Sequence, residues 1–307
     1  MVIMKEVIRI PSETYSVGLN HDVEYKRVRA CREGEGNDTL YRGLNLQIMI
    51  PRPEDRSRPQ GTYPVVIYSP GGGWKTPLVR YRLPIIVDLA KRGFVVVMAE
   101  YRGRESFNSW REPVSDVRSA VRFITRDAAK YCIDPENIFL LGDSAGAHLS
   151  LLAGIRGEEF DDPNDDLSIP VRIRGILELF GPTDLAGIER ELHDEKALDH
   201  PVTPIIQKTF EDFARSSDPG RITDVLNSAG VISRISLGTE IPPVLIAQGT
   251  ADIIVPTWSA EKLYEALRKA GKETEYYLLE GARHGDMRFY GKVMMDRYEQ
   301  FIRKHAK

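Results

Sequence analysis

The most restrictive feature of this chain is the pentapeptide Gly-Asp-Ser-Ala-Gly at positions 142–146, which directly follows the apolar run 137–141. The run predicts a buried strand, and residues 147–153 predict a helix. A turn this tight brings the positions two before and two after the serine against neighbouring backbone, where glycine fits because it has no Cβ. The pattern therefore predicts a sharp turn that lifts the Ser144 hydroxyl above a sheet, at a helix N-terminus whose free N–H groups attract an anion.

Short apolar runs alternate with amphipathic segments along most of the chain. Strands are predicted at 65–68, 94–98, 137–141, 173–179, 243–246 and 275–279, and helices at 83–92, 116–124, 147–153, 259–270 and 293–302. This alternation indicates an α/β fold with a mostly parallel central sheet and helices on both faces. Segments 23–30 and 44–50 flank a turn and predict an antiparallel hairpin at the start, preceded by an arm that ends near Asp22. We expect one domain over 1–307.

Residues 185–241 interrupt the alternation, because they contain no clear strand although the neighbouring units follow one another closely. A connection this long inside a compact domain is usually functional. Only 209–215 looks helical within it. We expect 185–241 to be a cap, or lid, inserted over the sheet edge that carries the active-site loops.

The composition favours a globular enzyme over a nucleic-acid or membrane protein. The net charge is −3 without blocks of basic residues, so no nucleic-acid partner is expected. No stretch approaches the length of a membrane span, and the first residues do not resemble a secretion signal, so we expect a cytoplasmic protein with no membrane partner. Cys31 and Cys132 are too few for a disulfide framework and are expected to be free thiols.

A serine nucleophile needs a base, and the base needs an acid that orients it. In a fold with this turn, the chain order is Ser, then Asp or Glu, then His. His284 follows the last predicted strand, where a base can reach Ser144, and Asp252 follows the strand before it. We predict a catalytic triad of Ser144, Asp252 and His284. His148 lies one helical turn beyond the serine and is expected to be structural.

Other acids and serines fit less well. Glu280 and Asp286 lie too near His284 in sequence to meet its far nitrogen easily. Ser228 lacks a glycine two residues before it and follows no apolar strand, so we interpret it as a loop or cap residue. The acidic stretch 161–166 lacks the glycine and glutamate that a calcium-binding EF-hand loop needs, and no His/Cys cluster has zinc spacing. We expect no metal and no cofactor.

An oxyanion needs backbone N–H donors. One is expected from Ala145, directly after the nucleophile, and two from Gly72 and Gly73 in the loop after the predicted strand 65–68. A glycine triplet lets this loop turn its N–H groups inward. Trp74, Tyr81 and Trp258 are candidates for lining a substrate pocket, with plain core packing as the alternative. A phosphate-binding loop is excluded because no Gly-Lys-Ser/Thr follows.

These motifs make the chain resemble the α/β-hydrolase superfamily, in the serine esterase branch of acetyl/feruloyl-esterase-like carbohydrate esterases and hormone-sensitive-lipase-like esterases. The resemblance covers about 44 to the end and is carried by Pro-Gly-Gly-Gly-Trp at 70–74, the pentapeptide at 142–146, Gly-Thr-Ala-Asp at 249–252 and Arg-His-Gly at 283–285. It implies hydrolysis of carboxylic esters without a cofactor. Pro70 stands where the family usually has histidine, so the loop must be ordered in another way.

The sequence therefore predicts a serine carboxylesterase that hydrolyses short-chain esters through an acyl-enzyme, including acetyl or feruloyl esters of carbohydrates. Short acyl chains are expected because 185–241 is rich in charge and shows no continuous apolar stripe of the kind that binds a lipid interface. Two alternatives remain open. One is an arylformamidase- or peptidase-like amide hydrolase that uses the same triad, and the other is a non-catalytic small-molecule receptor on a hydrolase fold.

Overall fold

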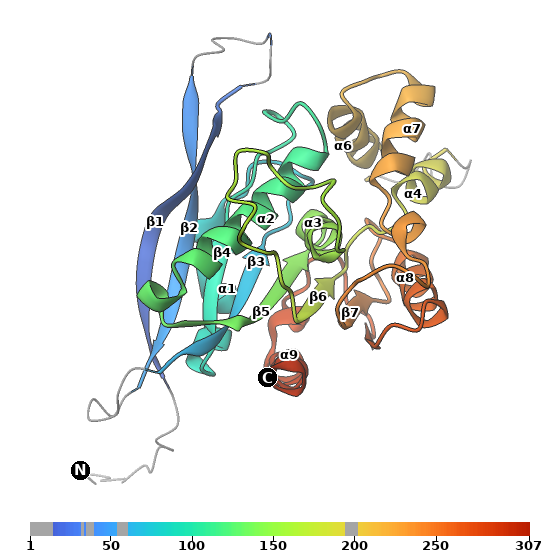
Figure 1. Cartoon of the computed structure of the whole chain (residues 1–307). Helices are drawn as coiled ribbons and strands as arrows, with labels where there is room; N and C mark the ends of the chain where they lie inside the picture. Colours follow the sequence, from blue (N-terminus) through green and yellow to red (C-terminus); the bar gives the residue numbers. More distant parts are fainter. Residues whose placement is uncertain (1–14, 32–33, 35–39, 54–60, 194–201) are drawn as a thin grey trace, which may run out of the picture.

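A computed structural model of the chain describes residues 15–31, 34, 40–53, 61–193 and 202–307 (Figure 1). Its centre is an eight-stranded sheet with the order β1-β2-β4-β3-β5-β6-β7-β8. The strands are β1 Ser16–Arg29, β2 Tyr41–Arg52, β3 Tyr63–Ser69, β4 Val95–Ala99, β5 Ile133–Asp143, β6 Gly175–Leu179, β7 Val244–Gly249 and β8 Thr274–Leu279. The pairs β1–β2 and β2–β4 are antiparallel, and all later pairs are parallel. The predicted fold class is confirmed.

Alternate side chains of each central strand enter separate cores on the two faces of the sheet. Val65 and Ile67 of β3 pack in one core, and Val66 and Tyr68 pack in the other. All four are fully buried. A strand buried on both faces consists almost entirely of apolar residues, which explains why these runs were visible in the sequence.

Helices cover both faces and extend beyond one end of the sheet. They are α1 Val79–Lys91, α2 Arg111–Arg126, α3 Ala145–Gly154, α4 Leu185–Glu191, α6 Thr203–Ala214, α7 Pro219–Ala229, α8 Thr257–Lys269 and α9 Lys292–His305, with short 3-10 turns η1 Ala128–Tyr131, η2 Ile232–Arg234 and η3 Met287–Tyr290. Buried residues of α2, α3 and α8 join the first core, and those of α1 and α9 join the second. Among the described helices, none combines the length and apolar character needed to cross a membrane.

The segment between β6 and β7 is helical over more of its length than the sequence indicated. Helix α6 begins at Thr203 and not at 209, because Pro204 lies in its first turn, where proline needs no hydrogen-bond partner for its nitrogen. Helices α4 and α6 both contact α7, and the three gather beside one another at the upper right of Figure 1.

The first strand also differs from the sequence expectation. β1 begins at Ser16, so residues assigned to an N-terminal arm belong to the sheet. Most of the early part of β1 is half-buried or exposed, because β1 is the edge strand. A polar edge strand lacks the apolar run that identifies a buried one, and this explains the missed start.

The parallel strands β3, β5, β7 and β8 place the candidate catalytic loops at one edge. Parallel strands end on the same side of a sheet, and their carboxyl ends are where α/β proteins bind ligands. Residues 70–74 follow β3, Ser144 follows β5, Asp252 follows β7 and His284 follows β8.

Candidate active site

Ser144 occupies a strained turn between β5 and α3. Its φ of 51° and ψ of −124° lie outside the regions that non-glycine residues normally adopt. The turn is compact: a Cβ on Gly142 would lie 2.3 Å from the Gly146 carbonyl oxygen, and one on Gly146 would lie 1.9 Å from the Ser69 oxygen. The Ser144 N–H is anchored to the Leu179 oxygen at 2.9 Å. Both glycines of the motif are therefore required by space.

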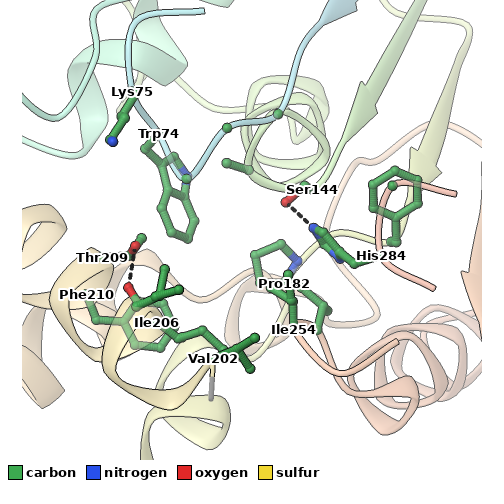
Figure 2. Close-up of a pocket in the computed structure, with 18 of the residues that line it drawn as sticks. Trp74, Lys75, Ser144, Pro182, Val202, Ile206, Thr209, Phe210, Ile254 and His284 are labelled. Carbon is green, nitrogen blue, oxygen red and sulfur yellow. Dashed lines mark hydrogen bonds between the residues drawn. The ribbon is translucent and has the colours of Figure 1, made fainter. Parts of the chain in front are cut away.

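In the predicted triad, His284 lies within hydrogen-bonding distance of both Ser144 and Asp252. The Ser144 Oγ lies 2.9 Å from the His284 Nε2, and the His284 Nδ1 lies 2.8 Å from the Asp252 Oδ2. Figure 2 shows the bond between serine and imidazole at one end of a cavity. The ring of Phe180 lies edge-on to the imidazole with its centroid at 5.0 Å, which restricts how the imidazole can turn.

Asp252 is held in place by backbone groups of its own loop, which joins β7 to α8. Its Oδ1 accepts hydrogen bonds from the backbone N–H groups of Ile254 and Val255, both at 2.9 Å. Its Oδ2, which faces His284, also lies 3.3 Å from the Gln248 Nε2. The carboxylate therefore keeps one oxygen directed at the imidazole, as the orienting acid of such a triad must.

Three backbone N–H groups lie around the serine without an acceptor. Within the described part of the chain, those of Gly72, Gly73 and Ala145 donate no hydrogen bond to another protein group. Gly72 and Gly73 have φ of 136° and 59°, conformations that side-chain-bearing residues rarely adopt. Gly71 abuts the nucleophile, because a Cβ there would lie 2.8 Å from the Ser144 Cβ. This loop can therefore present N–H donors beside the serine hydroxyl.

The loop is ordered by contacts that replace the histidine usual at the position of Pro70. The Tyr101 hydroxyl donates to the Pro70 carbonyl oxygen at 2.6 Å. The next N–H, that of Gly71, donates to the buried Asp143 Oδ1 at 2.6 Å. Asp143 also accepts hydrogen bonds from the hydroxyls of Tyr68 and Tyr290. The residue before the nucleophile therefore ties the loop after β3 to the turn that carries Ser144.

Trp74 and His148 tie the same loop to α3 and α7. The Trp74 indole N–H donates to the His148 Nδ1 at 3.2 Å, and the opposite ring nitrogen lies 2.8 Å from the Ala229 carbonyl oxygen. A ring that accepts at Nδ1 and donates at Nε2 is neutral, and burial lowers the pKa of His148 to about 4. Trp74 has a φ of 58°, an unfavourable backbone conformation for a residue with a side chain. Its ring packs on that of Phe213 with the centroids 4.5 Å apart, and these contacts hold the conformation.

A cavity of about 710 Å³ opens above the serine. Its wall combines the loop after β3, residues 70–74, with an apolar surface from α6 and its neighbours (Figure 2). We call this loop the oxyanion loop, after the role predicted for it. Val202, Ile206 and Phe210 face the cavity opposite Ser144. Helix α6 therefore supplies a continuous apolar face, which the charge-rich sequence of 185–241 concealed.

Of the three aromatic pocket candidates, the structure places only Trp74 in the cavity wall. Tyr81 is 78% exposed on the first turns of α1. Trp258 lies on α8, where its indole N–H donates to Glu191 at 2.7 Å and Lys262 lies over its ring. The assignment of Tyr81 and Trp258 to the pocket is wrong, because both helices direct these rings to solvent or to a neighbouring helix.

The residues judged less suitable as nucleophile, acid or metal ligand are bonded to other groups of the chain. The Ser228 Oγ accepts from Trp110 and donates to the Val225 oxygen, and no histidine of the described residues is bonded to it. Asp286 pairs with Arg288. In the acidic stretch 161–166, Lys26, Arg118 and Arg122 pair with three of the four carboxylates, and Asp166 accepts hydrogen bonds from Ser168. No group of three or more potential metal-binding side chains is found among the described residues.

Asp143, Tyr101 and Gln248 are site residues that sequence reasoning missed. Asp143 and Tyr101 contact backbone groups of the loop after β3, which are distant in sequence, so no spacing rule identifies them. Gln248 lies only four residues before Asp252, but its contact with that carboxylate depends on the turn after β7. The one usable signal was the second position of the pentapeptide, where an acid directly before the nucleophile in a buried turn requires hydrogen-bond partners.

The sheet order, the nucleophile turn and the histidine loop together define an α/β-hydrolase. A family model, BD-FAE, matches residues 48–267, and the chain belongs to this family. The probable carboxylic ester hydrolase LipM of Mycobacterium tuberculosis is 27% identical over 224 residues, which are 71% of this chain and 48% of LipM. The chain thus spans about half the length of this relative.

Solved structures with this fold include two esterases. A truncated carbohydrate esterase from gut microbiota superimposes with a TM-score of 0.72 at 22% identity, over 96% of this chain and 98% of that one. Esterase 2 of Thermogutta terrifontis, phosphonylated by sarin, gives 0.67 at 25% identity over 94% and 95% of the two chains. Its butyrate-bound form gives 0.66 at 25% identity over 94% of each.

Proposed function

We propose that this chain is a serine carboxylesterase acting on small-molecule esters. The observation that carries the proposal is the unbroken hydrogen-bond chain from Asp252 through His284 to Ser144 at the end of an apolar cavity. Membership of the BD-FAE family, the name of LipM and the phosphonylated state of the Thermogutta terrifontis esterase support it.

In the proposed reaction, His284 Nε2 takes the Ser144 proton as the Oγ attacks the ester carbonyl carbon. Asp252 stabilises the imidazolium that forms. The imidazolium then protonates the alkoxide leaving group as the carbon–oxygen bond breaks, which gives an acyl-enzyme and an alcohol. Water enters, His284 removes its proton, and a second tetrahedral intermediate collapses to release the carboxylic acid and restore the Ser144 hydroxyl.

Both tetrahedral intermediates carry a negative oxygen, and we assign its stabilisation to the N–H groups of Gly72, Gly73 and Ala145. These donors are fixed before substrate binds, so little reorganisation is needed when charge develops. The start of α3 adds the positive end of a helix dipole beside the same oxygen. Removing one such donor from a comparable site costs about 100-fold in kcat or more.

We assign the segment 185–241 to a cap whose α6 face binds the apolar part of the substrate. Short acyl chains remain the proposed preference, and the butyrate bound to the Thermogutta terrifontis esterase supports it. The acidic and basic residues at 194–196, on which part of the sequence argument rested, lie outside the described residues. No observation favours an amide over an ester, so the amide hydrolase stays an alternative for the same test.

The test is hydrolysis of p-nitrophenyl butyrate and a matched p-nitroanilide by the wild type, Ser144→Ala and Ser228→Ala. We expect Ser144→Ala to lose about 10⁶-fold in kcat on the ester, because a triad without its nucleophile keeps only binding and oxyanion catalysis. Ser228→Ala should retain activity, and EDTA should change nothing. Ester hydrolysis by Ser144→Ala above a few per cent of wild type would refute the proposal, and faster anilide than ester hydrolysis would favour the amide hydrolase.

A further inference from the structure

The cavity above Ser144 is lined by more cationic than anionic side chains. The charged residues in its wall are Lys75, Arg82, Arg104, Lys208 and Asp143. A concave site lined mostly by one sign of charge, with apolar walls, concentrates ligands of the opposite sign. Whether this charge is available to a ligand depends on how far the protein already neutralises each group.

Asp143, the single carboxylate in the wall, accepts no hydrogen bond from the neighbouring Arg82. Asp143 already accepts hydrogen bonds from two tyrosine hydroxyls and the Gly71 N–H. The Arg82 Nη1 lies 3.8 Å from the Asp143 Oδ2, which is beyond hydrogen-bonding distance. Within the described part of the chain, no group accepts a hydrogen bond from the Arg82 guanidinium, although its side chain is only 34% exposed. Its N–H groups are therefore free to bind a ligand.

The other cations of the wall differ in how far carboxylates neutralise them. Lys75 lies at the opposite end of the cavity from Ser144 (Figure 2), and its ammonium pairs with no carboxylate among the residues that the structure describes. Arg104 and Lys208 both pair with Asp212, at 3.4 Å and 3.0 Å. Among the described residues, Lys75 therefore has no carboxylate partner, whereas Arg82 lies 3.8 Å from Asp143 and has guanidinium N–H groups without a hydrogen-bond acceptor.

We propose that the ester hydrolysed here carries a carboxylate besides its ester group, and that Arg82 or Lys75 binds this carboxylate. The inference rests on the proposed esterase function and adds its substrate class. The rest of the substrate is apolar, because Val202, Ile206 and Phe210 form the facing wall. A guanidinium bound to a carboxylate through two N–H groups gives direction as well as charge.

The experiment compares two pairs of esters of nearly equal shape. In the first pair, p-nitrophenyl hemiadipate carries a carboxylate at the end of its acyl chain, and p-nitrophenyl hexanoate is its neutral counterpart. In the second pair, the butyryl ester of 3-hydroxybenzoate carries the carboxylate in its alcohol part, and the butyryl ester of 3-hydroxybenzamide is its neutral counterpart. The readout is the ratio of kcat/KM for the anionic ester to that for the neutral one. A general disturbance of the oxyanion loop affects both members and cancels in this ratio.

We expect the ratio in one of the pairs to fall about tenfold in the double variant Lys75→Gln/Arg82→Gln, the size of effect expected for a hydrogen bond to a charged group. The single variants assign the loss to one cation. The charge-conserving replacement of that cation, Arg82→Lys or Lys75→Arg, should keep at least half of the ratio, whereas a purely structural role would not be rescued by charge. Lys269→Gln, which removes an exposed cation from α8, is the matched control and should leave the ratio unchanged.

A change of less than about threefold in both pairs would overturn the inference, and so would a charge-conserving variant as impaired as the glutamine variant. Ser144→Ala separates this failure from failure of the proposed function. If Ser144→Ala is inert on all four esters while the ratios stay flat, only the anionic substrate class is wrong. If Ser144→Ala hydrolyses any of them at the wild-type rate, the proposed esterase mechanism itself is wrong.

Discussion

Two buried carboxyl groups beside the nucleophile turn have opposite surroundings. Asp143 is surrounded by donors, namely the hydroxyls of Tyr68 and Tyr290 and the Gly71 N–H. Glu178, on β6, accepts a hydrogen bond from the Gly181 N–H through one oxygen, and its other oxygen has no partner among the described residues. A buried carboxyl with few donors favours its neutral form.

Asp143→Asn should lower kcat on p-nitrophenyl butyrate about tenfold while leaving the fold intact. The amide nitrogen that replaces one carboxylate oxygen cannot accept a hydrogen bond, so the Gly71 N–H competes with two tyrosine hydroxyls for a single acceptor oxygen. The loss should appear mainly in kcat, since the loop acts on the transition state. Tyr290→Phe, which removes one donor and leaves the carboxylate, should lose less. An Asp143→Asn variant with wild-type kcat would show that the loop is ordered without this carboxylate.

Glu178 provides a prediction about stability and pH. Burial raises the pKa of Glu178 to about 8 in the folded chain, above its usual value of 4.5. A raised folded pKa means that the folded state holds the proton more tightly, so stability is full below about 4.5 and falls as pH rises through about 8. Glu178→Gln cannot ionise and should therefore raise Tm relative to wild type more at pH 9 than at pH 5.

The measurement is thermal unfolding followed by circular dichroism between pH 5 and pH 9. Glu265→Gln, an exposed change on α8, serves as the control and should shift Tm equally at both ends of this range. If the difference in Tm between Glu178→Gln and wild type is the same at pH 5 and pH 9, ionisation of Glu178 does not limit stability at alkaline pH.

At the scale of elements, α6 is the helix that gives the cavity its apolar wall. Ile206, Phe210 and Phe213 recur at spacings of four and three residues, so they lie on one face of the helix. Phe210 and Phe213 both pack on Trp74 of the oxyanion loop. The helix that we propose to bind the apolar part of a substrate is therefore packed directly against the loop that we propose to stabilise the oxyanion.

Ile206→Asn should reduce the gain in kcat/KM from longer acyl chains. Burying one methylene contributes roughly 0.8 kcal/mol, or about fourfold, only where apolar surface receives it. The series acetyl, butyryl and hexanoyl p-nitrophenyl esters measures the slope, which should flatten in Ile206→Asn and stay unchanged in Leu237→Asn, an exposed change outside the cavity wall. Equal slopes in all three proteins would place the acyl chain away from α6.

At the scale of the whole molecule, the sequence predicted most of what lies on buried parallel strands and little of what depends on tertiary contact. The order of Ser144, Asp252 and His284 at three strand ends follows from apolar runs and chain order, and the structure brings all three together. The contact from Trp74 to His148 and the inner face of α6 depend on how distant segments pack, so neither has a local sequence signal. The misplaced start of β1 has the same origin in a polar edge strand.

The proposed mechanism requires Ser144 to be an activated nucleophile within the folded chain. The most direct measurement is intact-protein and peptide mass spectrometry after reaction with a fluorophosphonate probe. We predict one covalent adduct per chain, located on Ser144, formed much more slowly in His284→Ala and absent in Ser144→Ala and in unfolded protein. An adduct on another residue, or no labelling of the folded wild type, would contradict the account.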